Sequence, residues 1–198
     1  SGSGQIKIDV DTKANKSDQL AIAGNSSGTT KLAFTNLTPG KETGVTITDV
    51  VTVAGTSSAT DFSGSMLGGI YTYNLQYDAG DFNLVVTDTT IANGSTISSD
   101  RIIGNLTINT GGTLDAVSGT FALTGNMSNV GTVNMADGDT GDKVTVSGNF
   151  SGSGQVNIDV DTKANTSDQL AIAGNSSGTT KLAFTNLTPG EETGVTIQ

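Results

Sequence analysis

The sequence predicts an all-β protein built as a parallel β-solenoid. Gly accounts for 27 of the 198 residues, and aromatic side chains make up only 5% of the chain. Short clusters of Val, Ile and Leu alternate with polar residues, and no stretch has the 3.6-residue period of an amphipathic helix. A Gly-Asn dipeptide recurs at steps of 21, 23 and 26 residues, at Gly104, Gly125, Gly148 and Gly174. Short strands separated by turn residues at such a step are typical of solenoid coils.

A longer repeat encloses the shorter one. Residues 1–47 and 151–197 are identical except at four positions, where Ile6, Lys7, Lys16 and Lys41 of the first copy correspond to Val156, Asn157, Thr166 and Glu191 of the second. The opening SGSG recurs in register at residues 151–154, which indicates that it belongs to the repeat and is not an expression linker. The chain is therefore predicted to be part of an array with a 150-residue step.

The strands within these repeats show a period of two. Apolar residues at 156, 158 and 160 alternate with Asn157 and Asp159, so we expect the former inside the coil and the latter in solvent. The same alternation places Leu182 and Phe184 inside the next strand. Gly and Asn at the corners permit left-handed backbone, and stacked Asn and Thr side chains are expected to form polar ladders from coil to coil.

Residues 48–86 have a different composition. Two alternating apolar runs flank a turn at residues 78–81, and they place Tyr71, Tyr73, Leu75 and Tyr77 before it and Phe82, Leu84 and Val86 after it. This pattern predicts a β-hairpin with a bulky apolar face. An open solenoid end exposes strand edges and apolar core, so we interpret residues 48–86 as a cap. The predicted organisation is coils over 1–47, this cap over 48–86, and coils of the next repeat over 87–198.

Composition excludes several classes of function. The net charge of −10 and the single arginine argue against nucleic-acid binding, because phosphates would be repelled. The chain has no Cys and no His, which rules out disulfides, thiolate chemistry and a Ser-His-Asp triad. No apolar run is long enough to predict a transmembrane segment. No cofactor is expected.

Paired carboxylates are the remaining catalytic candidates. They occur as Asp9/Asp11, Asp159/Asp161 and Glu191/Glu192. Residues i and i+2 of a strand share a face, so each Asp pair could in principle perform acid–base chemistry or bind a cation. We interpret them instead as the solvated face of an alternating strand, and we predict that the protein is not an enzyme.

Calcium is the one metal that the sequence suggests. The segment ADGDTGDK gathers Asp137, Asp139 and Asp142 on a predicted tight turn, and carboxylate oxygens are the ligands that Ca²⁺ prefers. The segment lacks the nonapeptide period of calcium-binding β-rolls. DVDTKANKSDQL resembles an EF-hand loop only in its first two acidic residues. Asp137, Asp139 and Asp142 are therefore a candidate calcium site.

The chain resembles the C-terminal part of pertactin-like autotransporter passenger domains. The resemblance lies in the coil sequence from Gly148 to Phe184, in its copy at residues 1–34, and in the junction-type hairpin GGIYTYNLQYDAGDFNL from Gly69 onward. It implies a right-handed parallel β-helix displayed on or released from the Gram-negative outer membrane. With the organisation predicted above, the β-hairpin capping segment lies between two solenoid segments. In that family the junction region normally precedes the membrane barrel, whereas here further coils follow it.

The expected function follows from this resemblance and from the repeats. We expect a structural or adhesive module of a cell-surface or secreted protein, giving reach and multivalent adhesion or cell–cell association. Its expected partners are neighbouring repeats or copies, and glycans or proteins of a host or cell surface. Two alternatives remain open at this point: a subunit of an extracellular filament or surface layer, and a carbohydrate-binding or carbohydrate-active β-helix.

Overall fold

The computed structural model describes residues 5–194 and 196–197, and within them every regular element is a β-strand. The chain divides into two compact units, Ser1–Asp88 and Thr89–Gln198. The all-β parallel solenoid predicted from the sequence is confirmed. The described residues contain no helix with the length and apolar character needed to cross a bilayer.

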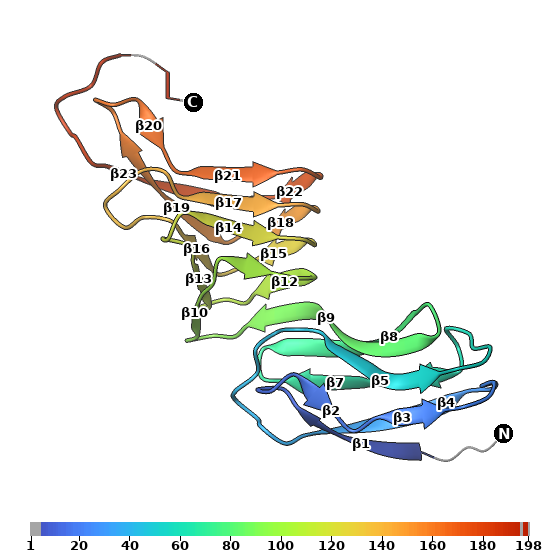
Figure 1. Cartoon of the computed structure of the whole chain (residues 1–198). Helices are drawn as coiled ribbons and strands as arrows, with labels where there is room; N and C mark the ends of the chain where they lie inside the picture. Colours follow the sequence, from blue (N-terminus) through green and yellow to red (C-terminus); the bar gives the residue numbers. More distant parts are fainter. Residues whose placement is uncertain (1–4, 195, 198) are drawn as a thin grey trace. The chain divides into compact units, whose positions relative to one another are not determined.

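The second unit is a stack of coils held together by three parallel ladders (Figure 1). The first ladder contains β12 (Asn105–Ile108), β15 (Met127–Asn129), β18 (Phe150–Gly152) and β22 (Ser176–Gly178). The second contains β10 (Thr96–Ser98), β13 (Thr113–Asp115), β16 (Thr132–Asn134), β19 (Gln155–Asp161) and β23 (Lys181–Asn186). The third contains β11 (Arg101–Ile102), β14 (Thr120–Leu123), β17 (Lys143–Val146) and β21 (Gln169–Ile172). The short strand β20 (Thr166–Ser167) folds back antiparallel on β19.

The core of this unit follows from the two-residue period of its strands. Each strand sends alternate side chains inward, and residues in register on successive coils stack on one another. Leu114, Val133 and Val156 form one such column through the second ladder, and all three are fully buried. Phe121, Val144 and Leu170 form another through the third ladder.

The first unit begins with the same coil. Its parallel strands are β1 (Gln5–Asp11), β4 (Thr30–Asn36) and β6 (Phe62–Ser63) in one ladder and β3 (Leu20–Ile22) and β5 (Ile47–Val53) in another. The strand β2 (Lys16–Ser17) pairs antiparallel with β1, as β20 does with β19.

Antiparallel strands follow in the first unit. They are β7 (Ser65–Gly68), β8 (Tyr71–Asp78) and β9 (Asp81–Ile91), and β9 ends within the second unit. The turn between β8 and β9 has positive φ at Ala79 and Gly80, as a two-residue hairpin requires. Tyr73 and Phe82 are buried in one cluster with Leu32, so the predicted hairpin is present and packs on the coil core of its own unit.

In the second unit, the Gly-Asn corners of successive coils are joined by hydrogen bonds. Each Asn side chain accepts the backbone N–H of the Asn one coil later, from Asn126 to Asn105 at 3.0 Å and from Asn149 to Asn126 at 2.8 Å. The neighbouring glycines bond directly, and the N–H of Gly148 donates to the carbonyl oxygen of Gly125 at 3.0 Å. A Cβ on Gly125 would lie 2.3 Å from the oxygen of Gly104, so only glycine fits. The predicted polar ladder is therefore confirmed for Asn.

Three expectations about inside and outside are wrong. Asp159 was expected in solvent, but its exposed fraction is 1%, because the 137–138 loop of the preceding coil lies over its carboxylate. Leu182 and Phe184 were expected in the core, but they are 48% and 63% exposed. Within the described residues β23 pairs only with β19, so its other side carries no further strand.

Candidate functional site

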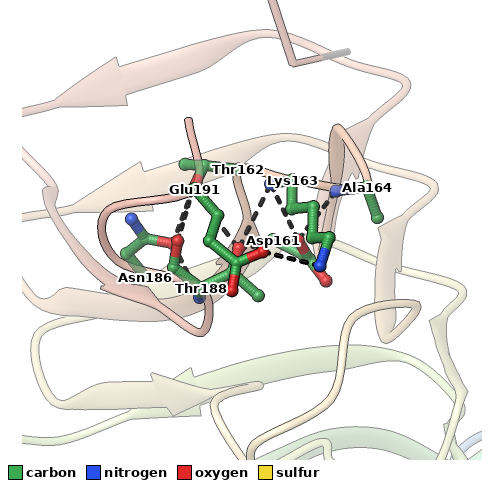
Figure 2. Close-up of polar contacts among 7 residues, drawn as sticks. All are labelled: Asp161, Thr162, Lys163, Ala164, Asn186, Thr188 and Glu191. Carbon is green, nitrogen blue, oxygen red and sulfur yellow. Dashed lines mark hydrogen bonds and ion pairs between the residues drawn. The ribbon is translucent and has the colours of Figure 1, made fainter. Parts of the chain in front are cut away.

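Two polar turns lie side by side in the second unit, and we call them the paired turns (residues 161–165 and 186–193). Parallel strands bring their carboxyl ends to the same edge of a sheet, and β19 and β23 are in register up to Val160 and Asn186. The turns that follow these strands are therefore neighbours. Figure 2 shows the polar contacts between them.

Asp161 is the centre of the paired turns. Its Oδ1 accepts the backbone N–H groups of Lys163 at 2.9 Å and Ala164 at 2.8 Å, and the hydroxyl of Thr188 at 2.8 Å (Figure 2). The Ala164 N–H, followed by the Thr188 hydroxyl, lowers the pKa of Asp161 below its ordinary value of 3.8. Donors that bond the charged form favour ionisation. Asp161 is therefore a fixed carboxylate that shapes the turn.

The remaining contacts lock the two turns together. The hydroxyl of Thr162 donates to Oδ1 of Asn186 at 3.0 Å, and the same oxygen accepts the N–H of Thr188 at 3.1 Å. Asn165 adopts a left-handed φ of 59°, which Asn tolerates better than most residues, and its side chain accepts the Thr193 hydroxyl at 2.7 Å.

An ion pair closes the outer side of the paired turns. The Lys163 ammonium lies 2.6 Å from Oε2 of Glu191, and both side chains are more than half exposed. Glu192 accepts the Gly190 N–H at 3.0 Å and the Asn186 amide at 3.3 Å. Both carboxylates of this sequence pair therefore have partners.

The first unit builds the same paired turns from residues 11–15 and 36–43. Oδ1 of Asp11 accepts the N–H groups of Lys13 at 3.1 Å and Ala14 at 2.9 Å, and the Thr38 hydroxyl at 3.0 Å. The outer ion pair of the second copy cannot form here, because Lys41 stands where the second copy has Glu191. Since both copies reach the same geometry, the local sequence determines it.

The predicted calcium residues have separate hydrogen-bonding roles. Asp137 accepts the Asp139 N–H at 3.0 Å, Asp139 accepts the Thr140 N–H at 2.8 Å, and Asp142 accepts the Gly119 N–H at 2.6 Å. Burial raises the pKa of Asp142, and the N–H of Gly119 partly offsets this. Across residues 5–194 and 196–197, no group of three or more acidic side chains is arranged to hold a metal ion. A calcium site at these residues stays a prediction.

Two buried aspartates hold this acidic loop in place: Asp159, which the sequence predicted to lie in solvent, and Asp168, which was not predicted to have a role. Asp159 accepts the N–H groups of Asp137 at 2.9 Å and Gly138 at 2.6 Å. Asp168 accepts those of Gly141 and Asp142, both at 3.1 Å, and that of Asp159 at 2.7 Å. A usable signal was present in the sequence, because a Gly-rich loop carries backbone donors that need acceptors on the adjacent coil.

The carboxylates of Asp11, Asp159 and Asp161 therefore act as hydrogen-bond acceptors that shape loops. Asp161 bonds three donors through one oxygen, and Asp159 is buried against two backbone amides. The two carboxylates bond to different loops, that of Asp159 to residues 137–138 and that of Asp161 to its own turn and Thr188. What the geometry offers to a partner is a polar surface at the paired turns whose side chains are joined by hydrogen bonds.

A comparison with protein families matches residues 1–86 to the family described as Pertactin. Residues 1–86 are a pertactin-like autotransporter passenger segment. The match spans the first solenoid coils and ends inside β9, in the hairpin that packs on them. Residues 151–197 repeat the beginning of this pertactin-like segment with four substitutions. No curated protein and no solved structure matches the chain.

Proposed function

We propose that the chain is a non-enzymatic structural and adhesive repeat module of a surface-displayed or secreted passenger protein of a Gram-negative bacterium. The observation that carries the proposal is that one sequence builds the same paired turns twice, at a 150-residue step, on a β-solenoid. The pertactin-like character of residues 1–86 supports the cell-surface setting.

Repetition gives the proposal its mechanism. A single exposed polar surface makes only weak contacts, but linked copies of it raise the effective concentration of the second binding event. The paired turns suit this role because their hydrogen bonds fix their shape before any contact is made, which lowers the entropy lost on binding. The partners would be glycans or proteins of another cell surface.

The absence of an enzymatic role is part of the proposal. Its support is that Asp11 and Asp161 are each already engaged by two backbone amides and a hydroxyl. A general acid would need a raised pKa, and the pKa of Asp161 is lowered.

Binding of the full chain to cultured epithelial cells, measured by flow cytometry, tests the adhesive role. Lys13 and Lys163 are exposed at equivalent places in the two paired turns, so Lys13→Ala and Lys163→Ala should each weaken binding. The double variant should lose about tenfold or more, because avidity disappears with the second copy. Arg101→Ala, an exposed charge outside the paired turns, is the matched control. Equal binding by the double variant and the unmodified chain would rule out the paired turns as the contact surface.

A filament subunit is the second candidate, favoured by the exposure of Leu182 and Phe184. Sedimentation velocity over a concentration series, with and without millimolar calcium, separates the two. A monomer at all concentrations supports the adhesive module, and growth into long species supports the filament. Growth only with calcium would support the site at Asp137, Asp139 and Asp142.

A further inference from the structure

The two copies of the repeat, residues 1–47 and 151–197, expose opposite sides of the same coil to solvent. Leu32 of the first copy is 1% exposed, whereas Leu182, its equivalent in the second, is 48% exposed. Asp159 of the second copy is buried, whereas Asp9, its equivalent in the first, is exposed. We call the side of a repeat that faces the preceding coil its leading side and the side that faces the following coil its trailing side. The first copy has its trailing side covered, and the second copy has its leading side covered. The first copy therefore reveals which structure the trailing side of the second copy accepts.

In the first copy, residues 51–63 cover that side, and we call them the cover segment. Its strand β5 pairs in parallel with β3, with Leu20 opposite Val51 and Ile22 opposite Val53. Its strand β6 pairs in parallel with β4, with Thr30 opposite Phe62. The segment thus adds two strands, joined by a corner, to the coil beneath it.

The corner of the cover segment is specific. The N–H of Gly55 donates to the oxygen of Gly24 at 3.1 Å, and that of Thr56 donates to Oδ1 of Asn25 at 2.9 Å. A Cβ on Gly55 would lie 2.3 Å from the Asn25 side-chain oxygen, so the cover segment needs glycine at this place.

An aspartate anchors the other end of the cover segment. Oδ2 of Asp61 accepts the Ser26 hydroxyl at 2.5 Å, and its carbonyl oxygen accepts the Thr30 N–H at 2.8 Å. The Ser26 N–H donates to the oxygen of Thr56 at 2.9 Å. Two of the acceptors on the cover segment are therefore used by backbone amides of the repeat.

The second copy carries every group that these contacts use. We call its trailing side, residues 170–184, the end face. Gly174, Asn175, Ser176 and Thr180 stand where the first copy has Gly24, Asn25, Ser26 and Thr30. In the described part of the chain, no strand lies on the outer side of β21, β22 or β23. The end face also exposes Leu182 and Phe184, which a cover would bury.

We propose that the end face is a docking site for an additional segment with the sequence pattern of the cover segment. The pattern is V-x-V-A-G-T, a four-residue turn, then Asp-Phe, as in residues 51–62. Exchange of residues 51–63 between two copies of this chain would not cover the end face without loss, because these residues would have to leave the first copy of the repeat. Moving them onto the end face would expose Leu32 in place of Leu182.

Hydrogen exchange on the full chain with residues 49–88 appended after Gln198, which stands at the place of Thr48, tests the proposal. The reporters are the amides of Ser176 and Thr180, whose equivalents Ser26 and Thr30 are bonded to the cover segment. We expect their exchange to slow at least tenfold, toward that of Ser26 and Thr30. The matched control carries alanine in the appended segment at the places of Gly55 and Asp61, and it should give no protection.

A second measurement guards against failure of the appended segment to fold. A synthetic peptide of residues 47–63, added to the unmodified chain, should slow the same two amides in proportion to its concentration. The proposal is overturned if neither the appended segment nor the peptide slows exchange of the two amides. It is also overturned if the alanine control slows their exchange as much as the unmodified appended segment does. Protection of the unmodified chain that grows with its own concentration would assign the end face to a second copy and would also overturn it.

Discussion

The N–H of Gly174 donates to the carbonyl oxygen of Gly148 at 3.0 Å, and a Cβ on Gly174 would lie 2.6 Å from that same oxygen. The corner glycines thus combine a hydrogen bond between coils with an approach that excludes any side chain. This pairing sets the spacing of the coils at Gly148 and Gly174.

Alanine substitution at the corner glycines should depend on the copy. Gly174→Ala should cost about 1–3 kcal/mol of unfolding free energy, because the new Cβ overlaps backbone that cannot move away. Gly24, its equivalent in the first copy, has open space around the position of a Cβ, so Gly24→Ala should cost little or stabilise slightly. Urea unfolding of both variants measures the difference. Equal losses would show that the corner contact does not set the coil spacing.

The buried aspartates give a second matched pair. Asp168 accepts three backbone amides, whereas among the residues that the structure describes Asp18, its equivalent in the first copy, accepts one, the N–H of Asp9. Asp168→Ala should lower the unfolding free energy by about 2 kcal/mol or more, because buried donors lose their acceptor. Asp18→Ala should cost less than about 1 kcal/mol, since water replaces its single exposed bond. Thermal unfolding followed by circular dichroism compares the two, and a larger loss for Asp18→Ala would contradict the prediction.

A single substitution in the first copy of the repeat should create there the ion pair that the second copy has. Lys41→Glu would create next to Lys13 the pair that Lys163 makes with Glu191 in the second copy. Because both groups are largely exposed, we expect a gain of about 0.2–1 kcal/mol that disappears at high salt. Glu191→Lys should give the reverse change. Unfolding at low and high salt measures both, and a gain that persists at 1 M salt, where the Debye length is about 3 Å, would exclude a Coulombic origin.

Two aspartates should respond to pH in opposite directions. The pKa of Asp161 is lowered by the Ala164 amide and the Thr188 hydroxyl, so its stabilising contribution is present above pH 3.8 and is lost as the pH falls through the lowered value. The pKa of Asp142 is raised mainly by burial, so its contribution is complete below pH 3.8 and is lost as the pH rises through the raised value. Carboxyl ¹³C shifts followed by NMR should show Asp142 titrating at the higher pH. The reverse order would contradict the hydrogen bonds assigned to Asp161 and the burial of Asp142.

Periodicity was enough to predict the solenoid and its corners. The alternation at residues 156–160 correctly places Val156 and Ile158 in the core, and the Gly-Asn spacing correctly locates the Asn ladder. The hairpin around residues 78–81 was also predictable, because its turn residues and flanking apolar runs are local signals. In each case the information lies within a few neighbouring residues.

Contacts between coils were harder to predict. The two-residue period placed Asp159 outside, but its carboxylate is covered by a loop about twenty residues earlier in the chain. The same period placed Leu182 inside, yet burial requires a neighbouring strand as well as the right face. Since Leu32 and Leu182 lie in the same local sequence, no local pattern could have distinguished them.

The near-identity of the two copies also has a genetic consequence. Recombination between the segments encoding residues 1–47 and 151–197 would remove or add one step of 150 residues and keep the reading frame. Both joined ends would carry the same strands, so the ladder would continue in register across the junction. Homologous exchange could therefore change the length of such a protein between generations while every coil kept a neighbour that fits it.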